Sequence, residues 1–201
     1  MVDFFVQGGG FMWPILIALL FGLAIIGERA YSLLNSSSNT NQFFDDVTTI
    51  YNDSGKDQAI EHCENTPGPV ASIFYAGLSK MGNAKEDIEK AVQNAGGLEM
   101  AFLEKNMIWI NSVITIAPML GFTGTVVGMI KAFEDIKMAN DISPAVVAGG
   151  ISQALLTTAF GLIVAMIMQV AQNFFVSMID KLILDMEEQS IKIVEYLHSS
   201  K

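Results

Sequence analysis

Residues 147–166 read VAGGISQALLTTAFGLIVAM and lie inside the longest stretch of this chain without a charged side chain, 142–179. Two earlier stretches, 4–27 and 106–130, also lack Asp, Glu, Lys and Arg. In chain order the three stretches contain 24, 25 and 38 residues. About 20 apolar residues cross the hydrocarbon core of a bilayer. The sequence therefore predicts an all-α membrane protein with three transmembrane helices.

Composition supports this class and excludes others. Of the 201 residues, 51% are hydrophobic and 16% are charged, whereas an ordinary globular domain has about 25% charged residues. The net charge is −10 and no polybasic cluster occurs, which argues against a nucleic acid partner. Cys63 is the single cysteine and the two histidines lie far apart, so we expect no internal disulfide and no metal site. The triplet His62-Cys63-Glu64 is interpreted as a solvated loop.

The distribution of apolar and charged residues divides the chain into seven segments. We expect an external N-terminus at 1–11, transmembrane helices at 12–33, 107–133 and 144–179, a cytoplasmic helical insert at 34–106, a short periplasmic loop at 134–143 and a cytoplasmic amphipathic tail at 180–201. As one helix, the third uncharged stretch would be about 57 Å long, nearly twice the ~30 Å core, so it must project into water. We also expect the second long helix to begin in the insert near Leu98 and to enter the membrane unbroken.

Lysine and arginine counts predict the orientation. The side that holds the insert and the tail has nine of them, and the other side has two, Lys131 and Lys137. Because cytoplasmic segments carry the excess of positive charge, we expect the insert and the C-terminus inside and the N-terminus outside. The external part of the chain is then small, so any work outside the membrane falls to another protein.

Small and polar residues share a face on each of the last two expected helices. On the second helix this face contains Pro118, Gly121, Gly124, Thr125 and Gly128. On the third helix it contains Gly150, Gln153, Ala154, Thr157, Gly161 and Ala165, with Thr158 at its edge. Small residues allow membrane helices to pack closely, and buried amides and hydroxyls either bond across helices or line a watery path. Both interpretations stay open, as does the choice between a packing kink and a hinge for the proline.

Motifs of catalysis are missing from the sequence. It contains no G-x-S-x-G, H-E-x-x-H or Walker A motif and no paired carboxylates within the apolar stretches. We therefore expect no enzymatic activity, no catalytic residue and no cofactor. The apolar stretches also lack the inverted repeats of a secondary transporter.

Two strings in order carry a family resemblance. APMLGFTGTVVGMIKAF at 117–133, followed by VAGGISQALLTTAFGLIVAM at 147–166, resembles the paired signatures of the MotA/TolQ/ExbB proton-channel family. Nearer the N-terminus, QGGGFMWPILI and IIGERAYSLL resemble ExbB members in particular. Together with the three-span topology, the resemblance covers nearly the whole chain, and only the insert at 35–97 is unspecific.

The resemblance implies a multi-pass subunit of an ion-driven motor in the bacterial inner membrane, in contact with lipid. Such subunits form a homopentamer around a dimer of single-span partners similar to ExbD or TolR, and protons pass an aspartate of the partner. The motion drives a TonB-like protein and thereby outer-membrane transport. TolQ-like members instead serve the cell envelope. MotA-like members turn flagella and have four spans, so the short external loop favours ExbB or TolQ.

The resemblance also assigns roles to residues. It implies an ion path lined by Thr125 and Thr158, with Gln153, Thr157 and Pro118 as further lining residues. It leaves helix packing to Gly121, Gly124, Gly128, Gly150, Ala154 and Gly161. Relatives usually have glutamate where this chain has Gln153, which leaves sodium as an alternative ion. A non-conducting scaffold and a channel that works without a partner remain alternative functions.

Overall fold

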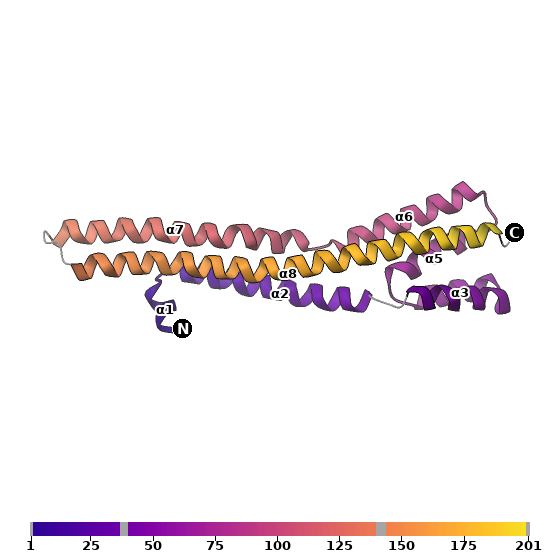
Figure 1. Ribbon diagram of the computed structural model, residues 1–201, viewed down its shortest axis with the longest axis horizontal. Helices are drawn as coiled ribbons and strands as arrows, with labels where there is room; N and C mark the ends of the chain where they lie inside the picture. Colours follow the sequence, from indigo (N-terminus) through magenta and orange to yellow (C-terminus); the bar gives the residue numbers. More distant parts are fainter. Residues whose placement is uncertain (1, 37–39, 140–143, 200–201) are drawn as a thin grey trace. The chain divides into compact units, whose positions relative to one another are not determined.

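The computed structural model describes residues 2–36, 40–139 and 144–199, and within these ranges it contains helices and no strand (Figure 1). The helices are α1 (Val2–Gln7), α2 (Met12–Ser36), α3 (Thr40–Ser54), α4 (Lys56–Asn65), α5 (Pro69–Ser79), α6 (Lys85–Leu103), α7 (Met107–Ala139) and α8 (Pro144–Ser199). Three segments, within Met12–Ser36, Lys85–Met138 and Val147–Ser199, are long and apolar enough to cross a membrane. The expected all-α fold with three membrane helices is confirmed.

Contacts divide the chain into two compact units. The first unit combines Met1–Glu28 with Asn106–Phe174, and the second combines Arg29–Lys105 with Phe175–Lys201. α8 continues through the boundary as one helix of 56 residues. Residues 140–143 of the expected periplasmic loop lie outside the described residues.

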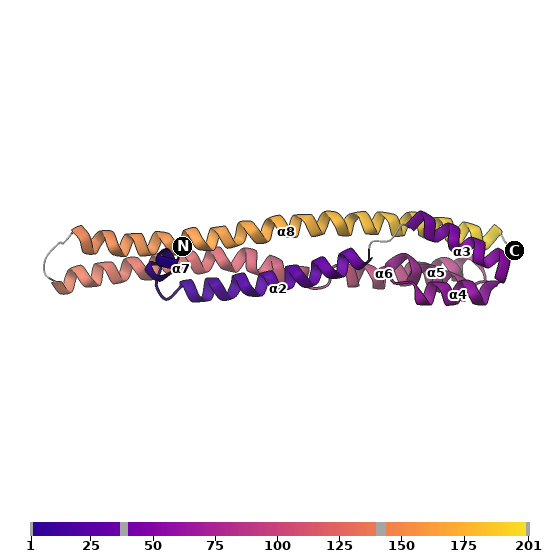
Figure 2. The same cartoon turned by 90° about the horizontal axis from the view of Figure 1, so that it is seen from below.

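In the first unit, α7 and α8 run side by side in opposite directions, as Figure 2 shows. Glycines of both helices lie against the neighbouring backbone. α2 packs beside this pair, because a Cβ on Gly22 would meet the side chains of Met168 and Val113. Only 17% to 28% of each apolar window is buried inside the chain. The remaining apolar surface therefore has to be covered by lipid or by other chains.

The expected unbroken helix from Leu98 into the membrane is wrong, because a turn at 104–106 separates α6 from α7. Asn106 adopts a left-handed φ of 64°, which asparagine tolerates better than most residues. Its Nδ2 atom donates to Glu28 Oε2 at 3.2 Å in the first unit. In the second unit the buried Arg29 guanidinium donates to the carbonyls of Phe102 and Leu103 at the end of α6. The Arg29 bonds add donors to carbonyls at this helix end, where the Phe102 carbonyl also accepts from the Lys105 N–H.

The second unit packs α3 to α6 with the last part of α8. Phe74 on α5 is fully buried and contacts the rings of Phe43 and Phe44, at centroid distances of 5.5 and 5.9 Å. The interpretation of residues 62–64 as a solvated loop is wrong, because they lie in α4 and Cys63 is 3% exposed. The apolar side of α4 faces its neighbours, and His62 stacks on Phe43. Burial raises the pKa of Cys63 to about 12.

Candidate functional site

The seam between α7 and α8 is built from glycines that allow backbone contact. A Cβ on Gly161 would lie 2.5 Å from the Ala117 carbonyl oxygen, and one on Gly121 would lie 2.8 Å from the Thr157 carbonyl oxygen. Neither carbonyl can move aside as a flexible side chain would. The remaining close contacts place Gly124 against Thr157, Gly128 against Ala154 and Gly150 against Ala132. All six residues predicted to pack helices therefore lie in this seam.

Two threonine hydroxyls converge on one carbonyl in the middle of the seam. Thr158 Oγ1 donates to the Gly121 carbonyl at 3.1 Å, and Thr157 Oγ1 lies 3.3 Å from the same oxygen. Thr157 also donates to its own helix, at the Ala154 carbonyl, and is 1% exposed. Thr158 is half-buried at the edge of the seam. Thr157 thus joins the two helices, whereas Thr158 has one side open.

Thr125 lies on the same side of the seam as Thr158. Viewed from one end of an antiparallel pair, the chain of one helix turns clockwise and that of the other turns anticlockwise. A residue one or four positions after a contact residue therefore lies on the same side of the pair, whichever helix it belongs to. Thr125 follows Gly121 by four and Thr158 follows Thr157 by one. We call this side the threonine face. Pro118, which follows the buried Ala117, lies on it as well, and α2 packs on the opposite side through Val113.

Gln153 lies on the side away from the threonine face, because it precedes Thr157 by four residues. Its amide contacts the N-terminal segment: a Cβ on Gly9 would lie 2.0 Å from Gln153 Nε2. Gly9 has a φ of 73°, which glycine adopts without strain. The structure therefore brings four of the five predicted path residues to the seam or its threonine face and places Gln153 against Gly9. The three glycines at 8–10 were the only sequence signal for this contact. That signal does not indicate which residue the glycines contact.

The chemistry of the threonine face is that of an acceptor surface. Thr125 Oγ1 donates to the Phe122 carbonyl of its own helix, and Thr158 donates to Gly121. Each hydroxyl thus uses its hydrogen on the backbone and leaves lone pairs for an external donor or a cation. No residue that titrates near neutral pH lies in 106–130 or 142–179. These two stretches therefore supply no group that can change charge beside this face.

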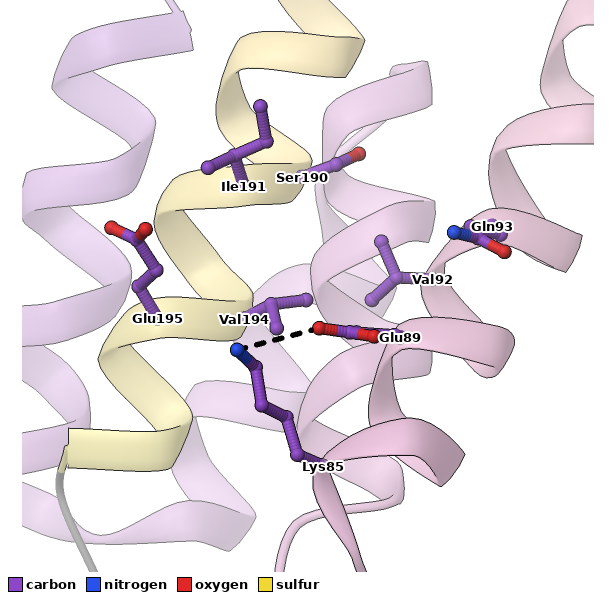
Figure 3. A pocket seen from close by; sticks show the side chains of 8 residues that line it. All are labelled: Lys85, Glu89, Val92, Gln93, Ser190, Ile191, Val194 and Glu195. Carbon is purple, nitrogen blue, oxygen red and sulfur yellow. Dashed lines mark ion pairs between the residues drawn. The ribbon is translucent and has the colours of Figure 1, made fainter.

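A hollow of the second unit has different chemistry. It measures about 310 Å³ and lies between α6 and α8, where Lys85 and Glu89 form an ion pair of 3.5 Å (Figure 3). Val92, Ile191 and Val194 contribute apolar side chains to the same hollow. Both charged groups belong to one turn of α6 and are partly exposed, so they form a solvated surface pair.

Comparisons with known proteins show which proteins this chain is similar to. Residues 65–188 match the model of the MotA/TolQ/ExbB proton channel family. The chain is 29% identical to the biopolymer transport protein ExbB-like 3 of Synechocystis, over 85% of this chain and 82% of that protein. It is 27% identical to the ExbB homolog of Methanothermobacter thermautotrophicus, over 89% and 64%. It is also 27% identical to the Tol-Pal system protein TolQ of Pseudomonas aeruginosa, over 65% and 58%. The chain thus spans less than two thirds of the last two relatives.

Proposed function

This chain belongs to the MotA/TolQ/ExbB proton channel family, and from that premise we propose that it is the ring-forming subunit of an ion-driven motor of the bacterial inner membrane. Five copies surround a dimer of a single-span partner similar to ExbD or TolR. Ion flow past this partner energises a TonB-like protein for outer-membrane transport. The insert and the C-terminus are cytoplasmic and the N-terminus is periplasmic, which follows from the nine positive charges against two.

The observation that carries this proposal is the threonine face. It presents acceptor oxygens from both α7 and α8 on the side where α2 does not pack. In a membrane such oxygens are favourable only beside a donor, a cation or water. The three uncharged stretches, 4–27, 106–130 and 142–179, hold no group that titrates near neutral pH. A carboxyl group on the partner helix supplies the site that alternates between charged and neutral.

Flux measurements in liposomes test whether proton transport needs both this chain and the partner's carboxyl group. The full chain alone should pass few protons, and the chain reconstituted with its co-purified single-span partner should pass many. Thr125→Val and Thr158→Val keep the shape and remove the hydroxyl, so native mass spectrometry should still show the pentamer while proton influx falls at least tenfold. Thr123→Val is the matched control, because Thr123 is an exposed α7 residue away from the threonine face.

Each contrary outcome has a definite meaning. Rapid proton influx through the chain alone would refute the shared site. A stable monomer would refute the ring and the motor together. Unchanged flux in both threonine variants would return these residues to helix packing and favour the scaffold function.

Two alternatives within the family have observations in their favour. A relative named TolQ supports an envelope role in place of TonB-dependent transport, and the co-purified partner decides between them. The oxygen-lined, uncharged face also suits sodium. We propose protons as the transported ion because of the family. Partner-dependent sodium influx without proton influx would show that the ion is sodium instead.

A further inference from the structure

We infer that the threonine face continues towards the insert as an amide-lined aqueous exit, formed by Asn111 and Thr115 of α7 and by Gln169, Gln172 and Asn173 of α8. This inference rests on the proposed function, because it names the route by which the ion leaves the threonines. It adds five polar residues that neither family signature contains. The occupant of the exit is water that carries the ion.

Three of the five residues are placed by buried residues beside them, and Thr115 and Asn173 follow Asn111 and Gln169 by four on the same helices. Ile110 and Met168 are fully buried in the first unit. Asn111 follows Ile110 by one, and Gln169 follows Met168 by one, so both lie on the side of the threonine face. Gln172 follows Met168 by four and lies on the same side at the seam itself.

Polar and apolar side chains are segregated at this level. In 109–116 and 167–174, Asn111, Thr115, Gln169 and Asn173 are exposed on the threonine side, and Gln169 Nε2 donates to Asn173 Oδ1 at 2.9 Å. The one hydroxyl of these ranges on the opposite side, that of Ser112, donates to the Ile108 carbonyl of its own helix. On the opposite side the exposed residues are apolar: Trp109, Ile116, Ile167, Val170 and Phe174. A helix pair surrounded evenly by lipid headgroups would have no reason to sort its side chains in this way. The sorting indicates water on one side and lipid on the other.

Gln172 provides a second observation. Its Oε1 atom is enclosed and has no hydrogen-bond donor among the described residues. An enclosed amide oxygen without a donor costs about 1–3 kcal/mol. A water molecule at the seam satisfies it and extends the chain of polar groups from Gln169 inwards.

The distance along α8 requires such an exit. Gln169 follows Thr158 by 11 residues, a rise of about 16 Å. If an ion is handed over at Thr158 near the middle of a core about 30 Å thick, it must travel about 15 Å more to reach water. Gln169 and Asn173 supply acceptors at the end of that distance, on the side where the ion starts.

Cysteine accessibility tests the inference without measuring transport. In a Cys63→Ala background, single variants Gln169→Cys, Asn173→Cys, Val170→Cys and Phe174→Cys are reconstituted as the full chain with the partner. They are then treated with a charged methanethiosulfonate reagent. Gln169→Cys and Asn173→Cys should react at least tenfold faster than the other two, which lie at the same depth. Comparable rates at all four positions would show headgroup exposure and overturn the inference.

A flux arm separates this inference from the proposed function. Gln169→Leu/Asn173→Leu should lower partner-dependent proton influx at least tenfold, while the control Val170→Leu/Phe174→Leu leaves it unchanged and both retain the pentamer. If Thr125→Val stops the flux and Gln169→Leu/Asn173→Leu does not, the exit is refuted and the proposed function stands. If no variant or wild-type complex conducts, the proposed function fails.

Discussion

Replacing Gly161 by alanine should separate α7 from α8, because the added carbon has no free space. Its Cβ would lie 2.5 Å from the Ala117 carbonyl oxygen and 3.3 Å from the carbonyl carbon. Ordinary contacts lie at about 3.5 Å, so the helices must move apart by roughly 1 Å, which removes a quarter to a half of the dispersion energy of each contact. Overpacking of this kind costs about 1–3 kcal/mol. In a chain of this size that corresponds to a fall in Tm of about 2–12 °C.

Thermal unfolding of the purified full chain in detergent, followed by circular dichroism, measures this effect. Gly149→Ala is the control on the same helix, because a Cβ there meets nothing within 4 Å. Its Tm should stay the same or rise, since alanine favours a helix by up to about 1 kcal/mol over glycine. Gly22→Ala should fall between the two, because the atom it meets is the flexible Met168 sulfur. Equal Tm values for Gly161→Ala and Gly149→Ala would refute backbone contact in the seam.

Three further predictions concern the second unit and the orientation. Burial raises the pKa of Cys63 to about 12, so the folded chain holds this proton more tightly than the unfolded chain does. Relative to Cys63→Ala, the free energy of unfolding should therefore be unaffected below about pH 8.5 and fall above it by up to about 1.4 kcal/mol per pH unit. Urea unfolding of both proteins at several pH values measures this, and parallel curves of stability against pH would contradict it. Arg29→Met removes the donors to the end of α6 and should cost about 1–3 kcal/mol in the same assay, whereas an unchanged midpoint would mean that the turn holds without them. Labelling from outside whole cells should modify Asp141→Cys and not Ser54→Cys, both in a Cys63→Ala background, and the opposite pattern would invert the orientation.

Much of the fold could be predicted from charge and periodicity. Three uncharged stretches predicted three membrane helices, because a charged side chain is costly in hydrocarbon whatever its neighbours are. The small residues of α7 and α8 predicted two packing faces, because residues three and four apart share one side of a helix. Both signals are local, so they could be read without tertiary information.

The side on which each polar residue lies could not be predicted in this way. Projection of α8 alone placed Gln153 and Thr157 on one stripe with Thr158 at its edge. The observed contacts place Gln153 against Gly9, Thr157 inside the seam and Thr158 on the open side. A projection about one axis cannot distinguish these positions, because they are defined by where the neighbouring helices lie.

Local sequence by itself thus determined the all-helical class, which segments can cross a membrane and which faces are small. Tertiary structure decided the contacts at the end of α6, where the Leu103 carbonyl accepts from Arg29, which lies 74 residues earlier in the sequence. It also decided the burial of Cys63, which depends on the helices packed against α4. In both places the deciding contact joins residues that are distant in the chain, and the free energy of that contact is absent from any local pattern.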